Sequence, residues 1–220
     1  MIHKYDVYRS PNVGLFVRTN NDTLLLPFGF AETKAKKLKE YLDVEKIIHV
    51  SIAGTRLIGP MTVMNNNGIL LPSTVSDDEI RILKQTGLNV ERLKSKFTAI
   101  GNLISANDKG AVVSNLFKGE VDQNIKDILG VPLQTLSIGG YIQVGSMIVA
   151  TNAGAIVHPI ASDSEISTIS EILQVEAEPA TVNGGSPFLS SGILANFSSV
   201  IVGNLTTGPE LIMISRGLKV

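Results

Sequence analysis

One pattern occurs five times along this sequence, and that repetition constrains the fold more than any other feature. Polar anchor residues recur at intervals of 42 to 45 residues, and an apolar triplet follows each anchor within six positions. The anchors are Asn20, Asn65, Asn107, Thr151 and Asn196, and the triplets are residues 24–26, 69–71, 111–113, 155–157 and 200–202. Eighteen positions after each anchor an aliphatic residue returns: Leu38, Leu83, Ile125, Ile169 and Ile214. Such a period indicates one supersecondary unit used repeatedly, so we expect an assembly of five similar units.

Composition is typical of one globular body. Of the 220 residues 44% are hydrophobic and 18% charged, and a chain of this length can bury a sizeable core. The sequence contains no cysteine, which excludes disulfides, thiolate metal sites and cysteine nucleophiles. A net charge of -1 argues against bulk affinity for nucleic acid. The first residues lack the apolar segment of a signal peptide, so we expect a cytoplasmic protein.

No charged residue occurs between Asp127 and Asp163, which could suggest a membrane span. Prolines and glycines interrupt this stretch, whereas a spanning helix needs about 20 mostly apolar residues in succession. We interpret it as short buried strands joined by turns.

The second unit shows the repeated pattern most clearly. Residues 65–68, Asn-Asn-Asn-Gly, suit a tight hairpin between the apolar runs 61–64 and 69–71. Ser76 and Glu79 then form a capping box that predicts a helix start, and Ser162 and Glu165 repeat it in the fourth unit. After each helix comes another apolar run that ends in a glycine turn. One unit is therefore two strands, a helix and a third strand.

The two ends of the chain complement each other. The fifth unit lacks its last strand, because the chain ends at Val220 just after a helical pattern over 209–218, and residues 2–8 form an extra strand before the first unit. We expect this N-terminal strand to complete the last unit and close a ring, which protects sheet edges. One glycine opens each unit: Gly14, Gly59, Gly101, Gly145 and Gly192. The predicted units are approximately 14–58, 59–100, 101–144, 145–191, and 192–220 plus 1–13, within one domain.

Five blocks of the sequence resemble translation initiation factor 6 of the archaeal and eukaryotic type. They are residues 51–59, 65–72, 99–102, 157–159 and 181–186, in order and at matching spacing along nearly the whole chain. The resemblance implies an α/β pentein fold, a five-fold pseudosymmetric ring or α/β propeller, in agreement with the five repeats.

The same resemblance implies a ribosome anti-association factor. Members of the family bind the intersubunit face of the large ribosomal subunit, near the sarcin–ricin loop and a neighbouring ribosomal protein, and obstruct joining of the small subunit. The resemblance further implies a monomer that acts in protein biosynthesis and ribosome biogenesis without a cofactor. The end at Val220, without a long polar tail, points to the archaeal branch. Pro60 stands where eukaryotic members have arginine, so we expect no charged contact there.

The turns that end the units should gather on one face of the ring. Five residues of these turns are candidate ribosome contacts: Arg56, Asn102, Asn183, Gly184 and Ser186. Arginine and asparagine there could donate to a ribosomal protein or an rRNA phosphate. The structural alternative is that Asn183 and Gly184 satisfy turn geometry, which we favour for these two, and that Arg56 pairs with a carboxylate.

Other residue groups give weaker indications. Four lysines on the first helix, Lys34, Lys36, Lys37 and Lys39, are typical of a solvated face. Three histidines, His3, His49 and His158, fall in different units without ligand spacing, so we expect no metal site. The repeated asparagines should hold hairpins and line a polar cavity at the centre.

Two alternative functions remain to be compared with the ribosome factor. The pentein fold also occurs in guanidine-modifying enzymes, but these resemble one another in using a cysteine nucleophile, which this sequence lacks. A general RNA-binding module is disfavoured by the near-neutral charge and by an aromatic content of 5%. We therefore expect a binding protein and not an enzyme.

Overall fold

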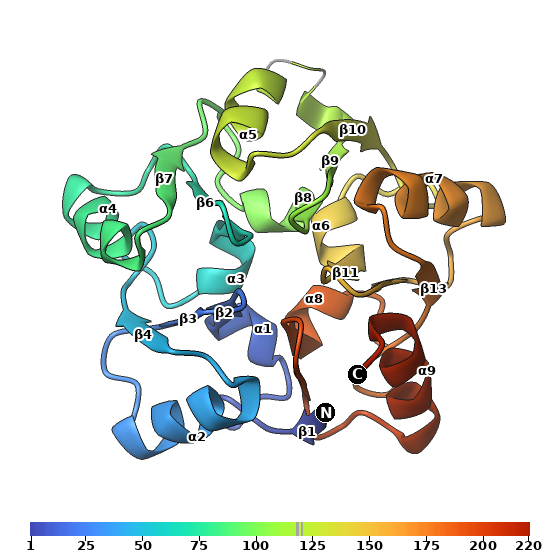
Figure 1. The fold of residues 1–220 in the computed structure, drawn as a ribbon, viewed down its shortest axis with the longest axis horizontal. Coiled ribbons are helices and arrows are strands. Elements are labelled where there is room, and N and C mark those ends of the chain that lie inside the picture. The colour runs from blue at the N-terminus through green and yellow to red at the C-terminus, as the bar shows by residue number, and fades with distance from the viewer. Residues whose placement is uncertain (118, 120) are drawn as a thin grey trace.

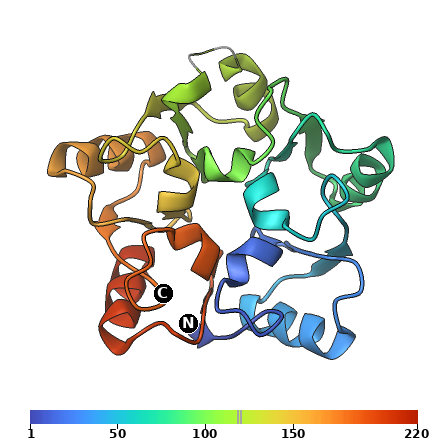
Figure 2. The ribbon, with the colours of Figure 1, turned by 180° about the vertical axis from the view of Figure 1, so that it is seen from behind.

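The computed structural model describes residues 1–117, 119 and 121–220, and it contains five three-stranded sheets in a five-fold arrangement. Figures 1 and 2 show the five units around a common axis from its two ends, with one longer helix of each unit at the rim. The predicted α/β class and the five-fold repetition are confirmed.

All five sheets have the same topology. A central strand pairs antiparallel with the strand before it and parallel with the strand after the rim helix. The first four sheets are β2 (Arg18–Thr19), β3 (Thr23–Leu26) and β4 (Lys46–His49); β5 (Val63–Met64), β6 (Gly68–Leu71) and β7 (Asn89–Arg92); β8 (Ile104–Ala106), β9 (Ala111–Ser114) and β10 (Leu133–Leu136); and β11 (Ile148–Ala150), β12 (Ala155–Val157) and β13 (Ala177–Pro179).

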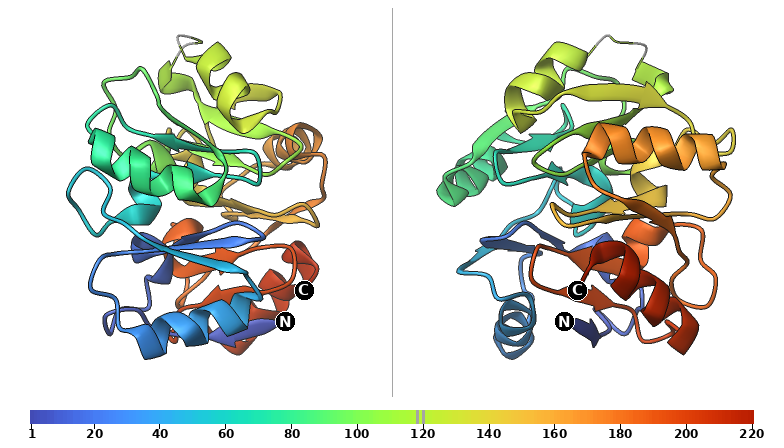
Figure 3. Two further views of the ribbon diagram at one scale, coloured as in Figure 1. Left: turned by 60° about the vertical axis from the view of Figure 1, so that its left-hand side comes forward. Right: turned by 45° about the vertical axis from the view of Figure 1, so that its right-hand side comes forward.

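The fifth sheet takes its third strand from the other end of the chain. It contains β14 (Ile193–Ala195), β15 (Val200–Val202) and β1 (Ile2–Lys4). Strand β1 pairs in parallel with β15, with Ile2 opposite Val200. The two chain ends accordingly lie close together in Figure 1 and in both views of Figure 3.

Two sets of helices accompany the sheets. The rim helices are α2 (Glu32–Leu42), α4 (Asp77–Leu83), α5 (Asp122–Leu129), α7 (Asp163–Leu173) and α9 (Gly208–Leu218). In the first four units the rim helix connects the central strand to its parallel neighbour, as a parallel pair requires, whereas α9 follows β15 and the parallel neighbour β1 comes from the other end of the chain. One-turn helices lie around the axis: α1 (Val13–Phe16), α3 (Ile58–Met61), η2 (Ile100–Asn102), α6 (Val144–Met147) and α8 (Leu189–Gly192). Two further 3₁₀ turns are η1 (Lys84–Thr86) and η3 (Asn115–Phe117).

The predicted apolar triplets are the central strands, and both of their faces are buried. In β3, Leu24 and Leu26 pack with Leu38 of α2, whereas Leu25 points the other way into the core of the second unit. The middle residues of the other central strands do the same, and Ile201 of the fifth unit packs into the core of the first. Each of these fully buried leucines contributes about 1.5–3 kcal/mol to stability. Every sheet is therefore shared between two cores.

Close backbone contacts hold the one-turn helices around the axis. A Cβ atom at Gly59 would lie 1.7 Å from the carbonyl oxygen of Gly14, and one at Gly14 would lie 1.9 Å from that of Ser190. Gly101 and Gly145 make equivalent approaches. Gly192, which was grouped from sequence with these glycines as the start of a unit, makes no such approach. The equivalent position is Ser190, which lies six residues before Asn196 as each of the other four lies six residues before its anchor. The turn at residues 182–186 is one residue longer than its counterparts.

The anchor residues join the units at one end of the axis, which we call the asparagine end. The side-chain amide of Asn20 donates to the carbonyl of Asn65 (3.1 Å), Asn65 to Asn107 (3.1 Å) and Asn107 to Thr151 (3.0 Å). The side-chain oxygen of each anchor asparagine accepts two amides of its own hairpin. The anchors also line a hollow on the axis, so these polar side chains fix both the hairpins and the contacts between units.

Candidate functional site

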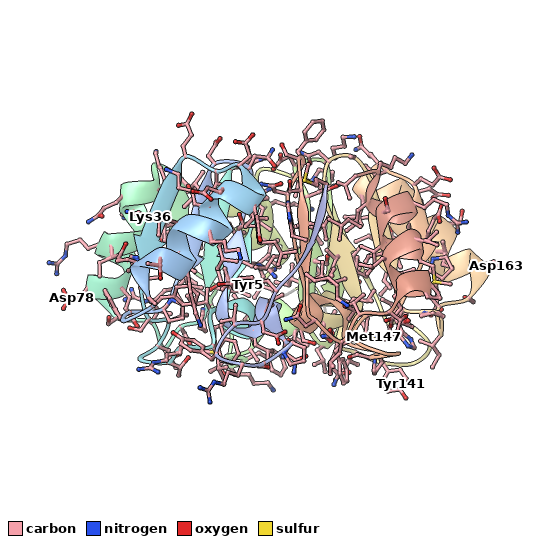
Figure 4. All side chains as sticks on the ribbon, turned by 90° about the horizontal axis from the view of Figure 1, so that it is seen from below. Tyr5, Lys36, Asp78, Tyr141, Met147 and Asp163 are labelled. Atoms are coloured by element: carbon pink, nitrogen blue, oxygen red, sulfur yellow. The ribbon has the colours of Figure 1, made fainter. Side chains whose placement is uncertain are left out.

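The turns that follow the third strands lie at the opposite end of the axis, which we call the turn face. Three two-residue hairpin turns join Val7 to Ser10, Ile52 to Thr55 and Ile138 to Tyr141, and a longer one joins Val182 to Ser186. In the side view of Figure 4, Tyr141 lies at the lower edge of the molecule. No such turn follows β7 of the second unit: Gly101 and Asn102, which were expected in it, lie in η2 among the axial contacts. Four turns thus project from this face.

Three glutamates fasten the turns to the rim helices. Glu210 of α9 accepts the backbone amides of Gly184 (3.0 Å), Gly185 (2.8 Å) and Thr207 (2.7 Å), and the hydroxyl of Thr181 (2.8 Å). Glu79 accepts the amide of Gly54 at 2.9 Å, and Glu165 accepts that of Gly139 at 2.9 Å. Each also closes the capping box of its own helix. The two predicted capping boxes are confirmed, and a third begins at Thr207.

These hydrogen bonds determine the charge state of the carboxylates. Burial alone would raise the pKa of Glu210, but the amide and hydroxyl donors outweigh it and lower the pKa from 4.5 to about 2. The same balance of burial and donors lowers the pKa of Glu79 and of Glu165. All three are ionised at neutral pH, so the turns are held by charge-assisted bonds, which are stronger than neutral ones.

Arg56 is exposed beyond the tip of the second turn. Its guanidinium carbon lies 5.9 Å from the ring centroid of Tyr8, in the turn that follows β1 of the fifth sheet. Among the described residues, none of the ion pairs includes Arg56, so the structure does not support the carboxylate pairing considered above. Tyr8 meets Phe16 and Phe30 edge to face. A cation above an exposed tyrosine keeps its donors free for a ligand.

Asn183 and Gly184 serve the turn itself. The Asn183 amide donates to the carbonyl of Pro11 (3.0 Å), and its oxygen accepts the hydroxyl of Thr206 (3.2 Å). Gly184 adopts a φ of +78°, a left-handed conformation that favours glycine, and its amide is bonded to Glu210. The structural interpretation favoured from sequence accounts for both residues.

Asn102 and Ser186 meet at a cavity on the axis. The cavity has a volume of about 540 Å³ and opens on the turn face, and all five units contribute to its lining. Pro60, at the position where an uncharged contact was expected, lines it as well. Of the predicted contact residues, the structure brings Asn102 and Ser186 together here, while Arg56 lies farther out.

Exposed apolar side chains on the turn face were missed from sequence. Tyr141 (51% exposed) and Phe188 (46%) line the axial cavity, and Tyr8 and Leu57 are exposed in or next to the turns Val7–Ser10 and Ile52–Thr55. Phe28, Ile160 and Leu205 follow central strands at the same end. The only sequence signal that could have identified Tyr141 and Phe188 as exposed was their position shortly after a glycine turn. Apolar residues exposed together, with polar residues between them, mark interaction surfaces.

The remaining candidates have local roles. Of the four lysines on α2, Lys37 lies over the rings of Tyr5 and Tyr41, and Lys39 donates to the carbonyl of Glu45. His3 stacks on Tyr41, and His158 accepts the amide of Ile160. Within residues 1–117, 119 and 121–220, no group of three or more His, Cys, Asp or Glu side chains could hold a metal ion. No helix in the same part of the chain is long and apolar enough to cross a membrane.

Comparison with known proteins places these features in one family. The sequence model of the eIF-6 family matches residues 2–217. The chain is 50% identical over 216 residues to translation initiation factor 6 of Nitrosopumilus maritimus, covering 98% of this chain and 97% of the relative. It is 49% identical over 216 residues to the factor of Cenarchaeum symbiosum, with the same coverage, and 39% identical over 223 residues to that of Pyrococcus horikoshii, covering 99% and 98%.

Proposed function

Because the chain belongs to the eIF-6 family, we propose that it is a ribosome anti-association factor that docks through its turn face. In this proposal the protein binds the intersubunit face of the large ribosomal subunit, next to the sarcin–ricin loop. It contacts a ribosomal protein there, with possible partners in the rRNA, and obstructs the small subunit sterically.

The observation that supports this proposal most is the combination of a fixed frame and exposed apolar groups on one face. The glutamates hold the turns before any partner arrives, which reduces the ordering cost of binding. Tyr8, Tyr141 and Phe188 supply the aromatic surface that interfaces favour, and Arg56 adds a cation. A standard interface buries about 800 Å² on each partner. That is roughly a tenth of the protein's 9139 Å² surface, so one face of the protein is large enough for such an interface.

Obstruction requires no covalent chemistry, so we further propose that the protein acts without a catalytic residue or cofactor, as a monomer in the cytoplasm. We assign the five-fold arrangement to the pentein class, a ring closed by the N-terminal strand. Its units are taken as 14–58, 59–100, 101–144, 145–191, and 192–220 plus 1–13. The observation that supports closure is that the fifth sheet packs into the first core as each earlier sheet packs into the next.

Sucrose-gradient sedimentation with purified ribosomal subunits tests the proposal. The protein should travel with the large subunit, and it should lower the yield of joined ribosomes when small subunits are added. Travel with the small subunit, or with neither, would refute it. Binding to both subunits and to unrelated RNA alike, with a steep salt dependence, would favour the general RNA-binding alternative.

Charge reversal tests the proposed docking face. Arg56→Glu should weaken large-subunit binding about tenfold or more, as loss of an interface arginine does, and leave thermal unfolding nearly unchanged. Arg81→Glu is the matched control, because Arg81 is also exposed but lies on α4, where its ion-pair partner is Asp78. Equal losses in the two variants would mean that net charge, and not the turn face, governs binding.

A further inference from the structure

A small cavity lies on the axis between the turn face and the asparagine end. Its volume is about 50 Å³, and all five units line it. The lining includes the Arg18 side chain together with hydroxyl residues Thr19, Ser105 and Ser190, and the rest is aliphatic or methionine. It shares Thr19, Met64 and Ala150 with the hollow at the asparagine end, so the two spaces adjoin.

Arg18 brings a cation into this cavity without a counter-charge. It belongs to β2, opposite Leu25 of β3, it is partly buried, and it is one of the residues that line the cavity. No aspartate or glutamate is among the lining residues, and the ion pairs of the described chain do not include Arg18. Strands β5, β8, β11 and β14 carry uncharged residues at the corresponding positions, Val63, Ser105, Val149 and Leu194.

The side chain of Arg18 stays positively charged at neutral pH. Burial lowers the pKa of Arg18 to about 10, and no other group in the structure contributes to that change. The guanidinium therefore stays protonated, with five N–H donors and no acceptor capacity. A cation removed from bulk water is costly unless it is paired and hydrogen-bonded. The space is sufficient for an ion, because a single water needs only about 10–15 Å³ on the same measure.

We propose that this cavity binds a small inorganic anion, held by the Arg18 guanidinium at the centre of the five units. Chloride is the simplest ligand of this class, and a small oxyanion such as phosphate is the other. A bound anion would neutralise Arg18 in the folded protein only. It would thereby stabilise the folded state in proportion to its concentration.

Thermal unfolding of the full chain at pH 7 tests the proposal in solution. Sodium chloride is titrated against sodium gluconate at constant ionic strength, because gluconate is too large for the cavity. At a chloride concentration ten times the dissociation constant, the ratio of folded to unfolded protein rises about 11-fold. For a chain of this size that corresponds to roughly 3–6 °C in Tm. A second titration with sodium phosphate distinguishes the two ligands: a rise with either anion supports the proposal.

Matched variants test whether Arg18 is the residue responsible for the dependence of Tm on anion concentration. Arg18→Met should abolish the anion dependence, and Arg18→Lys should retain part of it. Arg9→Met is the control, because it removes the same charge from an exposed turn and should keep the full dependence. A flat response of the unsubstituted protein to both anions would overturn the proposal. So would an unchanged response in Arg18→Met.

Crystals grown in bromide test the site directly and need no variant. An anomalous peak within about 3.5 Å of the Arg18 guanidinium, present at the bromide concentration that raises Tm, supports the proposal. Water alone at that position overturns it. A peak that appears only at molar bromide, with no change in Tm, indicates an adventitious ion only and overturns it as well.

Discussion

Replacing Glu210 with glutamine should destabilise the protein and loosen one turn of the proposed docking face. The side chain is only 5% exposed, and its two oxygens accept amides from Gly184, Gly185 and Thr207. Glutamine has nearly the same shape, but it keeps one acceptor oxygen and places an NH₂ group against donors. At least one buried amide is then left without an acceptor, which is expensive away from water.

The pKa of Glu210 sets the magnitude and the pH range. Its pKa falls from 4.5 to about 2 on folding, and each unit corresponds to about 1.36 kcal/mol, so the ionised carboxylate contributes about 3 kcal/mol as an upper value. A carboxyl with a lowered folded-state pKa stabilises the protein fully above pH 4.5. That contribution is lost progressively as pH falls from 4.5 towards 2. The expected cost of Glu210→Gln is therefore about 2–3 kcal/mol at pH 7 and close to zero near pH 2.

Urea unfolding between pH 7 and pH 2.5 measures this difference. Other carboxyls with lowered pKa values, such as those of Glu79 and Glu165, are present in both proteins and cancel in the comparison. Hydrogen exchange at Gly184 and Gly185 should accelerate in the variant. Glu45→Gln is the control, because Glu45 is exposed, and it should change stability by less than about 0.5 kcal/mol at every pH. A cost for Glu210→Gln that stays below 0.5 kcal/mol, or that does not vary with pH, would refute the reasoning.

Two further substitutions test how the units are joined. Gly59→Ala should lower the free energy of unfolding by more than about 3 kcal/mol or prevent folding, because its Cβ would collide with the carbonyl of Gly14. Gly208→Ala has open space around it and should change that free energy by less than about 0.5 kcal/mol. Circular dichroism during heating measures both. Asn65→Ala should cost about 2–3 kcal/mol in urea unfolding, because two carbonyls and two amides lose their partner. A near-neutral Asn65→Ala would mean that water replaces the amide without loss.

The sequence was sufficient to predict those features that repeat. Five buried triplets, five rim-helix aliphatics and two capping boxes follow from periodicity and local chemistry, and each has the predicted place. The helix predicted over 209–218 is observed from Gly208. The extra N-terminal strand is shorter than the predicted 2–8, since only Ile2–Lys4 pairs with β15 and Val7 already enters a turn.

Features that depend on three-dimensional approach could not be predicted. The fifth axial position was an exception, because Ser190 lies six residues before Asn196 just as Gly14 lies six residues before Asn20, and the spacing was overlooked in favour of the nearby Gly192. The capping glutamates were identified as helix caps, but their bonds to turns about 25 residues away depend on the packing of helix against sheet. The exposure of Tyr141 and the position of Arg18 at the small cavity likewise result from how the five units pack together.

The two ends of the axis are under different constraints. At the asparagine end four of the five anchors are asparagine, and each donates its side-chain amide to the next unit, so a substitution there removes a contact between units. Thr151, the exception, bonds its own hairpin through its hydroxyl and donates no amide to Asn196. At the turn face three of the four turns are held from below by glutamates that accept backbone amides, and the turn residues have positive φ, which favours glycine. The larger side chains differ from turn to turn, with Tyr8 within one turn and Tyr141 and Phe188 just after two others. A symmetric scaffold can thus present an asymmetric surface, which recognition of a single partner site requires.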